Sequence, residues 1–137
     1  MIFLDTNLLL RYLLRDDEVQ YQTVRALLLQ PRSYSASITV MLELAWMLKT
    51  QGWQRADVVA AFTALLDALP NFQPQSANDL RRAVAAYGQG MDFADALHLV
   101  LSHSAEADAF ATADRHLAKQ AEKQNLQPPV ELVRFPS

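Results

Sequence analysis

Five acidic residues of this chain lie next to, or inside, stretches that are otherwise apolar: Asp5, Glu43, Asp92, Asp95 and Asp114. Few lysines or arginines are close to them in the sequence. A carboxylate held near a core must protonate, pair with a cation or bind a metal ion, because an unpaired buried charge is costly. Hard oxygen ligands contributed by several elements suit Mg²⁺ or Mn²⁺. The pattern therefore indicates a metal-dependent hydrolase.

Each of these carboxylates also has a simpler explanation. Asp5 lies between an expected strand and an expected helix, where an aspartate cap alone contributes about 1 kcal/mol. Asp92 and Asp114 also precede expected helices. Glu43 lies well inside its helix with apolar neighbours, and the alternative is that it points to solvent. Asp95 shares a helix face with Asp92, where the alternative to a bound cation is the favourable dipole of a first helical turn.

Length and composition limit the classes of protein that need to be considered. The 137 residues predict one domain, 1–137, and the hydrophobic fraction of 51% excludes wholesale disorder. No cysteine is present, which excludes disulfides, thiolate zinc sites and a cysteine nucleophile. The net charge of -3 argues against binding nucleic acid by bulk charge. However, a nuclease that works through bound cations can be acidic, since the metals supply the positive charge.

The sequence also suggests a compartment. No apolar stretch is long enough to span a membrane. The segment Met1–Asp5 lacks the basic start and the small-residue cleavage site of a signal peptide. We therefore expect a cytoplasmic protein without membrane segments.

Hydrophobic patterning predicts strands that alternate with helices. We expect a short, fully buried strand over 1–5, further strands over 33–36, 109–112 and 131–135, and a possible one over 71–74. The expected helices are 6–15, 17–30, 37–51, 55–69, 77–87, 92–105 and 114–124. This order is typical of an α/β sandwich around a parallel sheet, in which sites gather at the carboxyl ends of strands. Asp5 and Asp114 are at such ends.

Four short motifs, in this order, resemble those of PIN-domain ribonucleases. They are Leu4-Asp5-Thr6-Asn7 after the first strand, the lone Glu43 in a mid-chain helix, Asp92-Phe93-Ala94-Asp95-Ala96-Leu97, and Thr112-Ala113-Asp114. The closest likeness is to the VapC-type toxins of bacterial toxin–antitoxin pairs, and it covers nearly the whole chain. The resemblance implies a three-layer sandwich with a central, mostly parallel sheet of four to five strands flanked by helices.

The same resemblance implies residue roles. Asp5, Glu43, Asp95 and Asp114 would be the catalytic, metal-binding set for Mg²⁺ or Mn²⁺, and Asp92 a neighbouring or additional ligand. Thr6, Asn7 and Thr112 would support these ligands through hydrogen bonds. The chain departs from such toxins at His98 and His103, where they usually carry apolar or small residues.

The resemblance also implies an activity and partners. It implies an endoribonuclease that leaves 5′-phosphate and 3′-hydroxyl ends, a cognate antitoxin and a homodimer. Six leucines of the first two helices offer more apolar surface than one core face needs, so we expect a groove there for an antitoxin segment. They are Leu9, Leu10, Leu13, Leu14, Leu27 and Leu28. Six basic residues could line an RNA path or be solvated: Arg11, Arg15, Arg81, Arg82, Arg115 and Lys119.

Two other classes of function remain open. A strand-end aspartate such as Asp5 can accept a phosphoryl group, as in a receiver or a metal-dependent phosphatase. However, Asn7 stands where a haloacid-dehalogenase-type phosphatase has an aspartate, and Lys119 and Lys123 are misplaced for a receiver. The third possibility is a PIN-like adaptor that keeps the fold without catalysis. No Gly-x-Ser-x-Gly motif and no glycine-rich phosphate loop is present.

Overall fold

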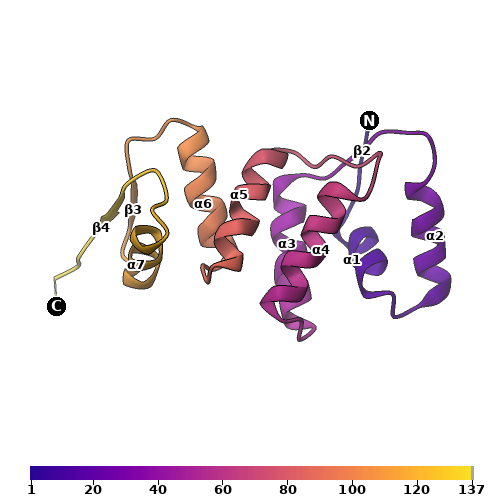
Figure 1. Cartoon of the computed structure of the whole chain (residues 1–137), viewed down its shortest axis with the longest axis horizontal. Coiled ribbons are helices and arrows are strands. Elements are labelled where there is room, and N and C mark those ends of the chain that lie inside the picture. The colour runs from indigo at the N-terminus through magenta and orange to yellow at the C-terminus, as the bar shows by residue number, and fades with distance from the viewer. Residues whose placement is uncertain (137) are drawn as a thin grey trace. The chain divides into compact units, whose positions relative to one another are not determined.

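The computed structural model describes residues 1–136 and has the alternation of strands and helices that the sequence predicts (Figure 1). It divides into two compact units, one formed by Met1–Ala77 and the other by the chain from Asn78 onward. Every strand pairing within the described residues is parallel. The α/β class with short parallel strands is therefore confirmed.

The first unit contains two short strands and four helices. Strand β1 (Ile2–Phe3) pairs with β2 (Tyr34–Ser35), and an isolated bridge joins Tyr34 to Phe72 within the expected fifth strand. The helices are α1 (Thr6–Leu14), α2 (Glu18–Leu28), α3 (Ile38–Thr50) and α4 (Arg55–Asp67). Helix α1 packs against α2 and α3, and α3 packs against α4.

Helical spacing of apolar residues explains the core of this unit. In α3 the buried residues are Met41, Leu44, Ala45 and Leu48, a spacing that places them on one face. The other face is exposed, including Trp46 at 65% of its surface. Trp46 is thus not part of the core.

One detail of the first strand differs from the prediction. We expected 1–5 to be fully buried, but Phe3 is 52% exposed and only Leu4 is buried. Successive side chains of a strand point to opposite faces. Leu4 therefore faces the core while Phe3 faces away from it, so the prediction of a strand buried on both faces was wrong.

The second unit contains three helices and a parallel pair of strands. The helices are α5 (Ala77–Gly88), which begins at the boundary, α6 (Phe93–Ser104) and α7 (Arg115–Lys123). Strand β3 (Phe110–Thr112) pairs in register with β4 (Val130–Leu132), and α7 packs against both strands. Parallel neighbours need a crossover connection, and α7 supplies it.

Capping residues fix where the helices begin. Five side chains each occupy the position before a helix and accept a backbone N–H hydrogen bond there: Asp5, Asp17, Ser37, Asp92 and Asp114. At the other end of α3, Gly52 adopts a φ of +85°, a conformation that L side chains rarely take. No helix within residues 1–136 is long and apolar enough to cross a membrane.

Candidate metal centre

Asp5 is held at the carboxyl end of β1 by its role as the cap of α1. Its Oδ1 accepts a hydrogen bond of 2.8 Å from the backbone N–H of Thr6. The bond uses one of the two carboxylate oxygens, so the other can bind a cation. Thr6 is buried, and its Oγ1 has no hydrogen-bond partner within residues 1–136, whereas Asn7 is exposed. Neither residue supports Asp5 through a side-chain hydrogen bond in that range.

Glu43 projects from the exposed side of α3. Its helix neighbours Leu44 and Ala45 are buried, so the helix packs through the opposite face. The structure therefore matches the alternative that Glu43 points to solvent. Asp5 is exposed as well. Both carboxylates belong to the first unit, where α1 packs against α3.

In the second unit, Asp92 and Asp95 begin α6. The Oδ2 of Asp92 accepts a hydrogen bond of 3.2 Å from the backbone N–H of Asp95, so Asp92 is a cap, as the simpler explanation predicts. Asp95 is the third residue of α6, in its first turn, and is half-buried, whereas Asp92 is exposed. Residues three apart lie on the same face of a helix, so the two carboxylates project from one side of this turn.

Asp114 caps α7 and is itself oriented by Thr112. Its Oδ1 accepts hydrogen bonds from the backbone N–H groups of His116, at 2.9 Å, and Leu117, at 3.1 Å. The backbone N–H of Asp114 donates to Oγ1 of Thr112 at 3.1 Å. Thr112 ends β3 and thereby fixes the turn from which Asp114 projects. The bond reaches the backbone of Asp114 and not its carboxylate, so the predicted support of that carboxylate by Thr112 stays a prediction.

The carboxylates of the second unit act on one another electrostatically. Partial burial raises the pKa of Asp95, and the negative charges of Asp92 and Asp114 raise it further. His98 and His116 oppose this shift of the Asp95 pKa. A divalent cation bound near these carboxylates would relieve the repulsion that disfavours ionisation of Asp95.

Two histidines, His98 and His116, act on the pKa of Asp95. The ring of His98 stacks on Phe110 with centroids 6.0 Å apart and planes at 14°. His116, which the sequence analysis did not single out, is exposed and lies close enough to Asp95 to affect its pKa. The sequence feature that could have identified His116 is its position two residues after a capping aspartate, in the first turn of α7.

The prediction that all five acids are held near the core was wrong. Four of the five acids, Asp5, Glu43, Asp92 and Asp114, are exposed, and only Asp95 is half-buried. A carboxylate in water needs no compensating cation. The apolar sequence around each acid misled the prediction, because caps and outward helix positions keep a charge in solvent beside core residues. The cost of buried charge therefore applies only to Asp95.

The oxygen donors of this set suit a hard divalent cation. Within residues 1–136, no three histidine, aspartate or glutamate residues lie close enough to share one metal ion. Asp92 and Asp114 act on the pKa of Asp95 through their charges, whereas metal ligands must approach an ion to ~2 Å. The joint set of five ligands stays a prediction.

Comparison with known proteins identifies the family. A family model of the PIN domain matches residues 2–123, a segment that runs from β1 to the end of α7 and contains all five acids. No curated protein and no solved structure matches the sequence significantly. PIN domains are typically nucleases and generally use divalent metal ions such as Mg²⁺ or Mn²⁺. Since the match covers most of the chain, this protein belongs to the PIN domain family.

Proposed function

We propose that this protein is an endoribonuclease that hydrolyses RNA phosphodiester bonds with Mg²⁺ or Mn²⁺. The observation that carries the proposal is the match of most of the chain to the PIN domain family, whose members are typically nucleases. Partial burial of Asp95 raises its pKa, and the negative charges of Asp92 and Asp114 raise it further. A bound cation would reverse that effect.

The proposed ligands are Asp5, Glu43, Asp95 and Asp114, with Asp92 as an additional one. When bound, the ion would polarise the phosphate and lower the pKa of an attacking water. The aspartate caps prepare this role, because each capping bond occupies one oxygen and fixes the direction of the other. No side chain then has to act as the nucleophile.

The proposal extends to a biological role as a VapC-type toxin. This role rests on the order of the motifs, and it entails a cognate antitoxin, a homodimer and a cytoplasmic location. The leucines of α1 and α2 offer less apolar surface for an antitoxin groove than the sequence suggested. Leu9, Leu10 and Leu28 are buried in the core, which leaves only Leu13, Leu14 and Leu27 half-buried.

The activity is tested by incubating the purified protein with labelled single-stranded RNA and Mn²⁺, and again with EDTA. We expect cleavage only with the metal, and loss of cleavage in Asp95→Asn. Asp108→Asn is the matched control, because Asp108 is an exposed aspartate of the same unit outside the proposed set. Metal-independent cleavage, or equal rates for the two variants, would contradict the proposed metal centre.

A non-catalytic adaptor is the second candidate. The exposure of four of the five acids favours it, because a carboxylate in water needs no metal ion. An adaptor would bind RNA or protein without Mn²⁺-dependent cleavage. It would also gain no thermal stability from Mn²⁺, whereas a metal centre binds the ion in the folded state and stabilises it.

A further inference from the structure

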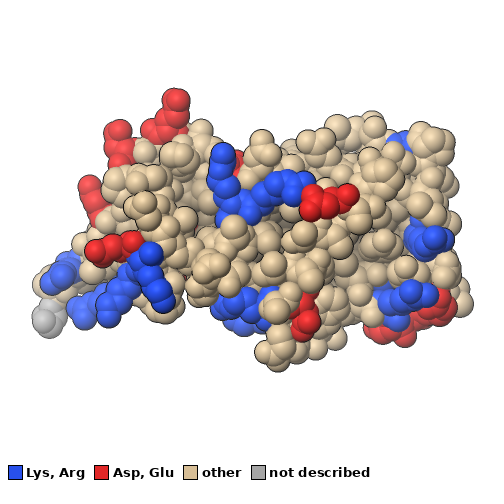
Figure 2. Space-filling model, in the orientation of Figure 1, with Lys and Arg blue, Asp and Glu red and all other residues tan. Residues whose placement is uncertain are grey.

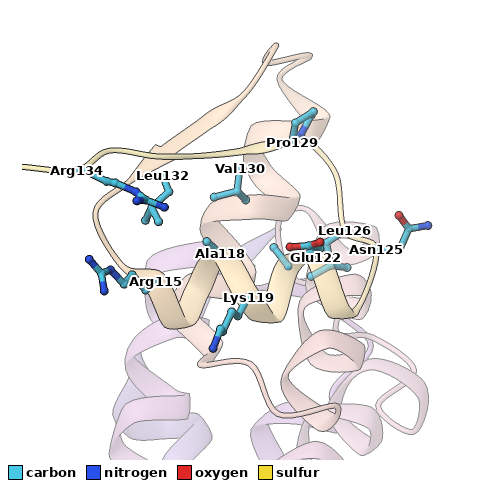
Figure 3. A pocket seen from close by; sticks show the side chains of 11 residues that line it. Arg115, Ala118, Lys119, Glu122, Asn125, Leu126, Pro129, Val130, Leu132 and Arg134 are labelled. Atoms are coloured by element: carbon cyan, nitrogen blue, oxygen red, sulfur yellow. The ribbon is translucent and has the colours of Figure 1, made fainter.

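A groove in the second unit lies between helix α7 and strand β4, and we call it the α7–β4 groove. It has a volume of about 610 Å³, within the range of ligand-binding cavities. Figure 3 shows Val130 and Leu132 pointing from β4 toward α7, where they form an apolar floor. Arg115 and Arg134 lie at one end of the groove, and Glu122 lies toward the other.

The basic side chains of the groove are unpaired. No salt bridge within residues 1–136 includes Arg115, Lys119 or Arg134, and all three are exposed. By contrast, Arg11, Arg15 and Arg82 are each paired with a carboxylate. Figure 2 shows Lys and Arg side chains gathered over the region of α7 and β4. Three unpaired cations on a chain of net charge -3 form a local site for an anion.

One end of the groove, at Arg115, directly follows Asp114, which is a proposed metal ligand. Asp114 caps α7, and Arg115 is the first residue of that helix. Lys119 follows one turn later on the same side of the helix. A nucleic-acid backbone that extends from Asp114 along α7 would therefore pass Arg115 and Lys119.

We propose that the α7–β4 groove binds an unpaired segment of RNA next to the cleavage site. Arg115, Lys119 and Arg134 contact its phosphates, and the apolar floor covers a base. The inference rests on the proposed function, since the RNA is the substrate.

The shape of the groove favours unpaired RNA. Proteins read RNA mostly where bases are unstacked and can enter a pocket. They hold single strands in positively charged grooves. A duplex offers phosphates but keeps its bases inside, so it would leave the floor of Val130 and Leu132 empty. Glu122 repels phosphate, which restricts the backbone to the arginine end.

The size of the expected effect follows from counterion release. Each phosphate contact with a single strand contributes ~0.7 to the slope of log K against log salt, which corresponds to about fivefold in affinity at ~0.1 M salt. Replacing Arg115, Lys119 and Arg134 together by glutamine should therefore weaken binding by ~100-fold and flatten the salt slope by ~2.

The test measures fluorescence anisotropy of a short labelled single-stranded RNA, and of the same RNA in a duplex, in EDTA. All proteins carry Asp5→Asn, which prevents cleavage under the proposed function. Lys119→Gln should weaken single-strand binding about fivefold at ~0.1 M salt. Lys123→Gln, an exposed lysine of the same helix outside the groove, should not change it. Glu122→Gln should tighten binding.

A filling variant tests the apolar floor. Ala118 lines the groove, and Ala118→Leu should weaken single-strand binding without changing the salt slope. Circular dichroism verifies that each variant is folded. The inference is overturned if Lys119→Gln and Ala118→Leu bind RNA as tightly as the parent. Equal affinity for duplex and single strand, or an acidic peptide as the only ligand sensitive to these changes, would overturn it too.

Cleavage assays without Asp5→Asn separate this inference from the proposed function. With Mn²⁺, the groove variants should raise KM and leave kcat nearly unchanged, whereas Asp95→Asn should abolish kcat. Cleavage that is insensitive to the groove variants would refute the groove alone. RNA binding that depends on the groove, without any cleavage by the unmutated chain, would refute the nuclease proposal and support the groove.

Discussion

Asp114 offers the sharpest separation between a structural and a chemical role, because its carboxylate caps a helix and is also a proposed metal ligand. Its Oδ1 accepts two backbone hydrogen bonds, from His116 and Leu117. Asparagine retains an acceptor oxygen in the same position and is as good a cap as aspartate. Asp114→Asn therefore removes only the charge, whereas Asp114→Ala removes both the charge and the cap.

The effect on stability can be calculated from this geometry. Loss of a capping side chain costs about 1 kcal/mol, and up to ~2 where two N–H groups lose their acceptor. The entropy of unfolding near the melting temperature is ~2.1 cal/mol/K per residue. For 137 residues this gives ~290 cal/mol/K, so 1–2 kcal/mol lowers Tm by about 3–7 °C. We expect that decrease for Asp114→Ala, and a Tm within about 2 °C of the parent for Asp114→Asn.

Calorimetry in EDTA and RNA cleavage with Mn²⁺ together decide between the roles. Both variants should lose at least about 10- to 100-fold in cleavage, because loss of a residue that only supports a metal ligand already costs that much, although only the alanine variant loses stability. Asp17 is the matched control, because it caps α2 through Gln20 and lies outside the proposed ligand set. Asp17→Ala should lower Tm and leave cleavage intact. Parental cleavage by Asp114→Asn would refute the ligand assignment and leave Asp114 as a cap alone.

Three further predictions follow from the same site. The pKa of Asp95 is raised, so its favourable contribution to folding is complete below the ordinary value of 3.8 and is lost as pH rises through the raised pKa. In EDTA, Asp95→Asn should therefore melt above the parent at pH 7, and the two should converge below pH 3.8; a difference that persists in acid would exclude this cause. Glu43 is exposed, so Glu43→Gln should leave Tm within about 2 °C of the parent while removing cleavage, and cleavage at the parental rate would exclude Glu43 as a ligand. Expression of the chain alone should arrest growth, Asp5→Asn should be harmless, and co-expression with a neighbouring antitoxin frame should yield an inactive complex; harmless expression of the unmutated chain would refute the toxin role.

Local patterning was sufficient to predict the order and type of the elements. Apolar spacing such as Met41, Leu44, Ala45 and Leu48 determines which face of a helix is buried, and this pattern can be read directly from the sequence. Helix starts were also predictable, because Ser37 and the capping aspartates satisfy backbone donors within a few residues of themselves. Strand edges were less predictable, since β1 and β2 each consist of only two residues and their extent depends on pairing.

The candidate site, too, could be predicted from the sequence only in part. The sequence alone located the five acids and the motif order of a PIN domain, because these are properties of neighbouring residues and their sequence. It could not determine exposure: an apolar neighbourhood in sequence suggested buried charges, whereas the helix period turns Glu43 outward beside a buried Leu44. Only the tertiary structure showed that partial burial and the charges of Asp92 and Asp114 raise the pKa of Asp95, and that Arg134 joins Arg115 and Lys119 around one groove. These are distances between segments far apart in the chain, which are set by how α6, α7 and β4 pack and are not encoded in any local pattern.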